Sequence, residues 1–184
     1  WNVKKATALG FALFLILSLP GCGSNEVEPR MTADEYTSQL WEAYEAAGYE
    51  VNELDEGSQS SGTDPDIGEY EYTGHIVSDG VYVATYERDG VLLRVHIMLD
   101  FTLATGPDIE LGAFAVGNLL SYADPDSSDD LYASLGLDDM DEGIYEADGH
   151  AGHYKALVGP LTTQSIFLIY TLDPISESTD NSSQ

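Results

Sequence analysis

Two histidines in a glycine-rich segment of this 184-residue chain have a spacing that suits metal binding. His150 and His153 are three positions apart, and two imidazoles at this spacing can coordinate one metal ion. Gly149 and Gly152 beside them favour a turn, and no third ligand follows at a fixed spacing. The pair therefore predicts either a weak metal site or a surface turn that carries two histidines.

The acidic segment 124–130, with the sequence DPDSSDD, is a second candidate site. Alternating side-chain oxygens suit calcium, and four aspartates would supply them: Asp124, Asp126, Asp129 and Asp130. The segment departs from an EF-hand loop, because Asp129 stands where the sharp turn requires glycine and Leu135 stands where a bidentate glutamate belongs. Two interpretations stay open, a calcium site and a solvated turn that caps the next helix.

A third candidate site consists of three polar residues on one face of a predicted strand. Arg94, His96 and Asp100 are an even number of positions apart, and such side chains lie on the same side of a strand. A cation, an imidazole and a carboxylate together can bind an anion or transfer protons. The alternative is a solvated sheet face on which Arg94, one of few basic residues, pairs with a specific carboxylate.

Tyrosine is abundant, with twelve residues in the chain. Tyr70 and Tyr72 share one predicted strand face, and Tyr82 and Tyr86 share another, which predicts an aromatic patch. Tyrosine is favoured both in strands and at binding surfaces. A half-buried sheet and a ligand-binding face are both compatible with this pattern.

Motifs of the common enzyme classes are missing from the sequence. The chain contains no G-x-S-x-G, Ser-x-x-Lys, H-E-x-x-H, phosphate-binding glycine loop or dinucleotide fingerprint. The sequence therefore favours a non-catalytic binding or scaffolding domain. The alternative is a small surface hydrolase that uses carboxylates or a histidine-bound metal, because paired carboxylates are defined by geometry rather than by spacing.

Acidic residues dominate the charge of the chain. There are 33 Asp and Glu residues against 6 Lys and Arg, which gives a formal net charge of −27. This excludes nucleic-acid binding through a basic face and electrostatic docking on anionic lipid, and it disfavours polyanionic substrates. The excess is explained either by a solvated surface, as in proteins of salt-adapted organisms, or by cation binding.

The amino-terminal segment has the pattern of an export signal. Lys4 and Lys5 precede about 14 mostly apolar residues at 6–19, fewer than the roughly 20 that a membrane-spanning helix needs. Cys22, the only cysteine of the chain, follows this segment and has no partner for an internal disulfide.

This arrangement resembles the lipobox of prokaryotic lipoprotein precursors, in which a leucine-rich end and a small residue precede an invariant cysteine. The matching residues are Leu19, Pro20, Gly21 and Cys22. The resemblance implies a diacylglyceryl thioether on Cys22, cleavage before it, and a location outside the cytoplasmic membrane. Two acyl chains anchor a protein stably, and residues 22–31 would form a polar tether.

The candidate sites must be positioned by the folded part of the chain, and the first predicted element of that part is a helix. Thr32 and Glu35 form a capping-box pattern, an apolar stripe at three- and four-residue spacing reaches Ala47, and Gly48 is placed to end the helix. Residues 49–54 alternate and predict a short strand. Residues 55–68, rich in Ser, Gly and Asp, predict a mobile loop.

A three-stranded antiparallel meander follows. Residues 70–78, 81–88 and 91–101 favour strands and are separated by two Asp-Gly pairs, the preferred chemistry of tight hairpins. On the third strand we expect the odd-numbered residues from Val91 to Phe101 to face the core. The even-numbered ones form the other, mixed face.

The remaining elements are a buried helix at 108–122, a short helix at 131–137 and two or three further strands. Gly112 and Gly117 are expected to allow close packing of the first helix, and Asp129 or Asp130 to cap the second. The strands are expected at 144–148, 153–158 and 164–172. The sequence thus predicts one α+β domain over 32–172, with an antiparallel sheet of about five or six strands and helices on one face. A signal peptide (1–21) and the tether (22–31) precede this domain, and a disordered tail (173–184) follows it.

Overall fold

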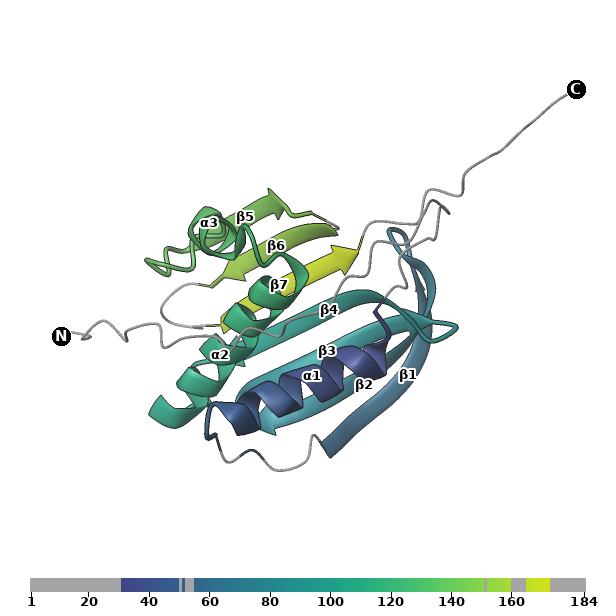
Figure 1. The fold of residues 1–184 in the computed structure, drawn as a ribbon, viewed down its shortest axis with the longest axis horizontal. Helices are drawn as coiled ribbons and strands as arrows, with labels where there is room; N and C mark the ends of the chain where they lie inside the picture. Colours follow the sequence, from purple (N-terminus) through teal and green to yellow (C-terminus); the bar gives the residue numbers. More distant parts are fainter. Residues whose placement is uncertain (1–30, 50, 52–54, 151, 160–164, 173–184) are drawn as a thin grey trace, which may run out of the picture.

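The computed structural model describes residues 31–49, 51, 55–150, 152–159 and 165–172. These residues form three helices and a seven-stranded antiparallel sheet, with the helices on one face of the sheet (Figure 1). The predicted α+β class is confirmed, and the sheet is larger than the five or six strands expected.

The sheet joins an amino-terminal group of four strands to a carboxyl-terminal group of three. Its order is β1-β2-β3-β4-β7-β6-β5, and β4 pairs with β7 at the junction. The elements in chain order are α1 (Ala33–Ala46), β1 (Asp55–Asp64), β2 (Gly68–Ser78), β3 (Val81–Arg88), β4 (Val91–Asp100), α2 (Gly106–Ala123), α3 (Ser128–Ser134), β5 (Gly143–Asp148), β6 (Gly152–Val158) and β7 (Ser165–Leu172).

Helix α1 begins and packs as its sequence predicts. The Glu35 backbone N–H donates to Thr32 Oγ1 at 3.1 Å, and the Thr32 N–H donates to Glu35 Oε2 at 2.8 Å, so the capping box is complete. Its buried stripe includes Tyr36 and Tyr44. The Tyr44 hydroxyl donates to the Leu111 carbonyl at 2.8 Å and thereby ties α1 to α2.

Helix α2 packs closely against β4 at one of its two inner glycines. A Cβ atom on Gly112 would lie 2.7 Å from Leu99 Cδ1, so the Leu99 side chain would have to shift for any larger residue. Gly117 has no atom within 4 Å of such a position, and the close packing predicted there is wrong. No described helix is both long and apolar enough to cross a membrane.

The meander of β2, β3 and β4 confirms the hairpin prediction. Asp89 and Gly90 have φ angles of 54° and 78°, the left-handed values that a tight hairpin requires at both turn positions. Gly80, in the preceding Asp-Gly turn, has φ of 80°.

The segment predicted as a mobile loop is a strand. β1 pairs with β2 from Asp55↔Ile76 to Asp64↔Gly68. Its polar composition misled the prediction, because an edge strand with exposed side chains obtains its order from backbone pairing and needs no apolar residues. Of the predicted strand at 49–54, the described residues Tyr49 and Val51 lie outside strands and pack against the core. Residues 50 and 52–54 lie outside the described part.

A bulge changes which residues of β4 face the core. Tyr86 pairs with Arg94 but Glu87 pairs with Leu92, so Leu93 is an extra residue in β4. Val95, Ile97 and Leu99 face the core as predicted. Before the bulge the alternation shifts by one, and Leu92 rather than Leu93 belongs to the core cluster.

The carboxyl-terminal strands confirm the predicted hairpin of β6 and β7, in which Gly152 pairs with Leu172. Helix α3 begins earlier than predicted, with Ser127 at its N-cap, so Asp129 and Asp130 lie in its first turn and are not caps. Negative side chains are favourable there because the helix dipole is positive at its amino end. The predicted signal peptide, the tether up to residue 30 and the tail lie outside the described residues.

Candidate functional site

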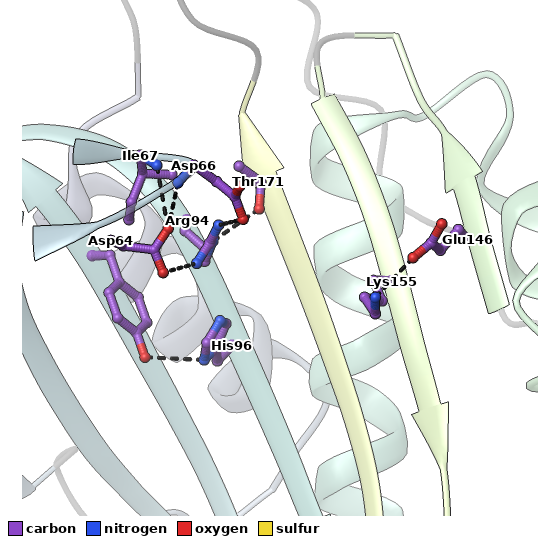
Figure 2. Close-up of polar contacts among 9 residues, drawn as sticks. Asp64, Asp66, Ile67, Arg94, His96, Glu146, Lys155 and Thr171 are labelled. Carbon is purple, nitrogen blue, oxygen red and sulfur yellow. Dashed lines mark hydrogen bonds and ion pairs between the residues drawn. The ribbon is translucent and has the colours of Figure 1, made fainter. Parts of the chain in front are cut away.

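Arg94 and His96 both lie on the face of the sheet opposite the helices, which is called the open face below. The Arg94 guanidinium is buried beside two aspartates and a threonine (Figure 2). Its Nη1 lies 3.1 Å from Asp64 Oδ2, its Nη2 lies 3.4 Å from Asp66 Oδ2, and its Nε donates to Thr171 Oγ1 at 2.9 Å. The expectation that this scarce arginine has specific carboxylate partners is confirmed.

The aspartates that bind Arg94 belong to the turn between β1 and β2. Asp64 Oδ1 accepts the backbone N–H groups of Asp66 and Ile67 at 2.9 Å and 3.3 Å, which closes the turn. The Asp66 N–H, with smaller contributions from Arg94 and the Ile67 N–H, holds the pKa of Asp64 below its usual value. Arg94 therefore holds the tip of the β1–β2 hairpin over the open face.

Asp100 does not join Arg94 and His96. It lies at the far end of β4, where its Oδ1 accepts the Thr102 hydroxyl at 2.6 Å and the Thr102 N–H at 2.9 Å. The predicted three-residue cluster is therefore wrong for Asp100, which closes the turn after β4. Alternation predicted which face of the strand these side chains occupy. It could not predict which of them lie close together, because β4 is 10 residues long.

His96 belongs to a group of aromatic side chains. Its Nδ1 is 3.0 Å from the Tyr86 hydroxyl, and the two rings lie 4.6 Å apart. The Tyr86 ring also meets Tyr70 and Tyr72 edge to face, at centroid distances of 5.1 Å and 5.2 Å. Burial, with a smaller effect of Arg94, lowers the pKa of His96 to about 4, so its imidazole is uncharged at neutral pH.

A hollow lies over Ala84 in the middle of the open face, whereas the space above Gly74 is taken by Tyr72, whose hydroxyl lies 2.7 Å from where a Cβ on Gly74 would be. Gly74 and Ala84 pair across β2 and β3, whereas the pairs on either side of them, Tyr72↔Tyr86 and Ile76↔Tyr82, are large. The hollow between these pairs has a volume of about 320 Å³. Its larger walls are Tyr72, Ile76, Tyr82, Tyr86, His96 and Met98.

Comparison of the chain with models of protein families, with curated proteins and with solved structures finds no match.

A second hollow, of about 440 Å³, lies beside the β1–β2 hairpin and is lined mainly by polar groups, including Glu69, Glu71 and Glu87. Burial and the neighbouring carboxylates of Asp34 and Glu71 raise the pKa of Glu87. Small organic ligands are typically held by apolar and aromatic walls, which the hollow over Ala84 offers and this polar one does not.

The two histidines of the glycine-rich segment lie on different elements. His150 is exposed in the turn after β5, and His153 lies on β6, where its Nδ1 is 2.8 Å from Asp148 Oδ1. Among the described residues, which exclude Ala151 between them, no group of three or more His, Cys, Asp or Glu side chains is arranged to hold a metal ion.

Asp124 is separated from the other aspartates of the acidic segment. It is 1% exposed, and its carboxylate accepts the Tyr154 hydroxyl at 2.6 Å and the backbone N–H of His150. Asp126, Asp129 and Asp130 are exposed. Asp124 therefore connects the end of α2 to β6 and to the turn before it, a role that its place in an acidic run did not indicate.

Several residues of this site had no signal that singled them out in the sequence. Asp64, Asp66 and Thr171 were missed, because any of the many acids could have paired with Arg94. Gly74 and Ala84 carry a weak signal, since each is a small residue between large ones in a strand. Only the register of β2 and β3 shows what the signal means: Ala84 lies in the floor of the hollow, and Gly74 beside it is covered by the end of the Tyr72 side chain.

Replacing Arg94 with methionine is expected to lower the free energy of unfolding by about 2–3 kcal/mol. Methionine fills much of the same volume. It cannot donate a hydrogen bond to Thr171, and it leaves the carboxylates of Asp64 and Asp66 close together without the positive charge of the guanidinium. Asp66, whose side chain is 78% exposed, contributes little of this effect. Urea unfolding measures the loss.

Arg88 provides the matched control because it is exposed at the end of β3. Arg88→Met is expected to cost less than about 0.5 kcal/mol. Equal losses in the two variants would contradict the role given to Arg94.

Proposed function

We propose that this protein is a lipid-anchored, extracytoplasmic, non-catalytic binding protein whose ligand site is the hollow on the open face. The observation that carries the proposal is the hollow itself, a concave, mainly apolar and aromatic site on the sheet face opposite the three described helices. Small-molecule sites typically combine such walls with a few polar groups. Here Tyr86 and His96 supply these polar groups.

The surrounding contacts support a preformed site. Backbone pairing of β2, β3 and β4 fixes the floor, and Arg94 fixes the hairpin that borders it. A site on paired strands holds its side chains more precisely than one on loops, so little conformational entropy is lost on binding. These features favour recognition of a small ligand over docking of a large flat partner.

Ligand titrations followed at the NMR signals of the Ala84 and Met98 methyl groups test the binding proposal. Benzyl alcohol, benzyltrimethylammonium and benzoate serve as neutral, cationic and anionic probes, with binding followed by NMR chemical shifts. We expect at least one probe to shift both methyl signals of the wild-type protein. Ala84→Trp fills the hollow and should reduce the affinity for that probe at least tenfold.

Ile144→Trp is the control for this experiment. Ile144 lies on β5, 66% exposed and away from the hollow, so the same large side chain there should leave binding unchanged. If no probe shifts the two methyl groups, or if both tryptophan variants bind equally, the hollow is not the ligand site.

The membrane anchor in this proposal rests on the resemblance of residues 19–22 to a lipobox. Cys22→Ala is expected to leave an uncleaved precursor that incorporates no labelled fatty acid in a prokaryotic host, because the thioether needs the cysteine sulfur. Gly23→Ala, one position later, is the control and should be processed and labelled. Normal processing and labelling of the Cys22 variant would refute the anchor.

A further inference from the structure

The hollow has aromatic walls on opposite sides. Its centre is Ala84, and Tyr82 and Tyr86 lie two positions before and after it on the same face of β3. Tyr72 pairs with Tyr86, and Met98 pairs with Tyr82. A ligand over Ala84 therefore lies between tyrosine rings and against a polarisable thioether. The negative faces of aromatic rings attract cations within about 6 Å.

Charges around the hollow also favour a cation. No Asp, Glu, Lys or Arg is among the described residues that line it, and the imidazole of His96 is uncharged at neutral pH. Arg94, two positions before His96 on β4, does not line the hollow and is paired with two carboxylates. The chain as a whole carries a formal charge of −27, so the long-range potential attracts cations and repels anions.

The donors and acceptors of the hollow select among cations. A primary ammonium has three N–H donors, and burying it requires acceptors, usually a carboxylate, to replace its water. Among the described residues that line the hollow there is no carboxylate, the hydroxyls of Ser58, Tyr72 and Tyr82 are neutral, and Tyr86 is already hydrogen bonded to His96. A quaternary ammonium has no N–H group, and its charge is spread over methyl groups that pack against aromatic and thioether walls.

We propose that the hollow over Ala84 binds a quaternary ammonium group held between Tyr72, Tyr82 and Tyr86. This inference rests on the proposed function and names the chemical class of the ligand. The pairing of β2, β3 and β4 places the three rings before the ligand arrives. Affinity then comes from the ring faces and from the negative potential of the chain.

Choline and its neutral isostere 3,3-dimethylbutan-1-ol test the inference, because they share one shape and differ in charge. Both are titrated into the full chain at fixed ionic strength, with binding followed at the Ala84 and Met98 methyl groups. We expect choline to bind at least tenfold more tightly. Tyr82→Leu should reduce choline affinity at least fivefold and change alcohol affinity less than twofold, whereas Tyr82→Phe should retain choline binding because it keeps the ring.

Tyr86→Leu provides a second variant with the same expectation if the Tyr82 variant fails to fold. Equal affinity for the two compounds overturns the quaternary ammonium inference while the hollow remains a binding site. Choline binding that Tyr82→Leu and Tyr86→Leu both leave unchanged overturns it as well, because attraction by net charge alone would explain it. No binding of choline, together with binding of benzyl alcohol, overturns only this inference. No binding of any compound overturns the proposed function too.

Discussion

Gly80→Ala is expected to destabilise the protein by about 4 kcal/mol, far more than the same change at Gly90. Both glycines follow an aspartate in a hairpin turn and both have positive φ, 80° and 78°. An L-residue pays about 1–3 kcal/mol for that conformation at either position. The difference lies in what a Cβ atom meets. At Gly80 it would lie 2.7 Å from the Asp100 carbonyl oxygen and 2.8 Å from the Ala104 nitrogen, whereas at Gly90 nothing lies within 4 Å.

Backbone atoms cannot move aside as the end of a flexible side chain can. The turn after β4 would have to shift, together with the hydrogen bond of 2.7 Å from the Asp100 N–H to the Gly80 carbonyl. Gly90→Ala is the matched control and should cost about 1–2 kcal/mol. Urea unfolding of the two variants distinguishes the cases, and equal midpoints would show that the Gly80 turn does not lie against the end of β4.

Asp124→Ala is expected to cost about 3 kcal/mol, because it leaves the buried Tyr154 hydroxyl and the His150 N–H without their acceptor. The Tyr154 ring is fully buried and stacks on Tyr170 at 4.4 Å, so its hydroxyl cannot turn to solvent. Burial and the hydrogen bond to Asp124 raise the pKa of Tyr154 well above its ordinary value, and this hydroxyl stays a donor at any working pH. Thermal unfolding should show a loss of roughly 6–12 °C.

Two variants separate this contact from the general acidity of the segment. Asp126→Ala, at an exposed neighbour, should change the melting temperature by less than about 2 °C. Tyr154→Phe removes one donor, so Asp124→Ala should cost less in that background than in the wild type. Strictly additive losses would mean that the two side chains do not interact.

The sequence predicted those elements whose local pattern agrees with their environment in the fold. Helix α1 has a capping box and an apolar stripe, and the meander has Asp-Gly turns between β-rich runs. These signals are local, because capping bonds join residues three apart and hairpin turns need only two residues of suitable φ. Both were therefore visible before any tertiary contact was known.

Strand β1 and the bulge in β4 depend on partners that the sequence does not name. Ser58, Ser60 and their neighbours favour a loop by composition, and only pairing with β2 makes them a strand. Strict alternation predicted that Leu93 faces the core, and because Leu92 and Leu93 are chemically identical, nothing in the side chains could correct that prediction. The extra residue in β4 opposite Tyr86 and Glu87 decides it.

The candidate site was only partly predicted, because some of its features follow from local patterns and others depend on distant partners. Alternation predicted that Arg94 and His96 share one strand face and that the tyrosines of each strand share another, but that these faces form one surface is seen only in the structure. The partners of Arg94 did not, since Asp64 is 30 positions away and Thr171 is 77 positions away, and the chain has 33 acids. The hollow required the register of two strands, which places Gly74 beside Ala84.

The junction of β4 with β7 has a consequence for how the chain can be assembled. β4 lies inside the sheet, yet its partner on one side is β7, the last strand that the structure describes. While the chain is synthesised from its amino end, β4 has an open hydrogen-bonding edge until residues 165–172 have emerged. An open edge rich in Val, Leu and Ile can pair with a second unfinished chain, and charged residues such as Arg94 and Asp100 near the ends of β4 oppose that pairing. Arg94, which binds Thr171 once β7 has formed, therefore also opposes intermolecular pairing at the edge of β4 before β7 is present.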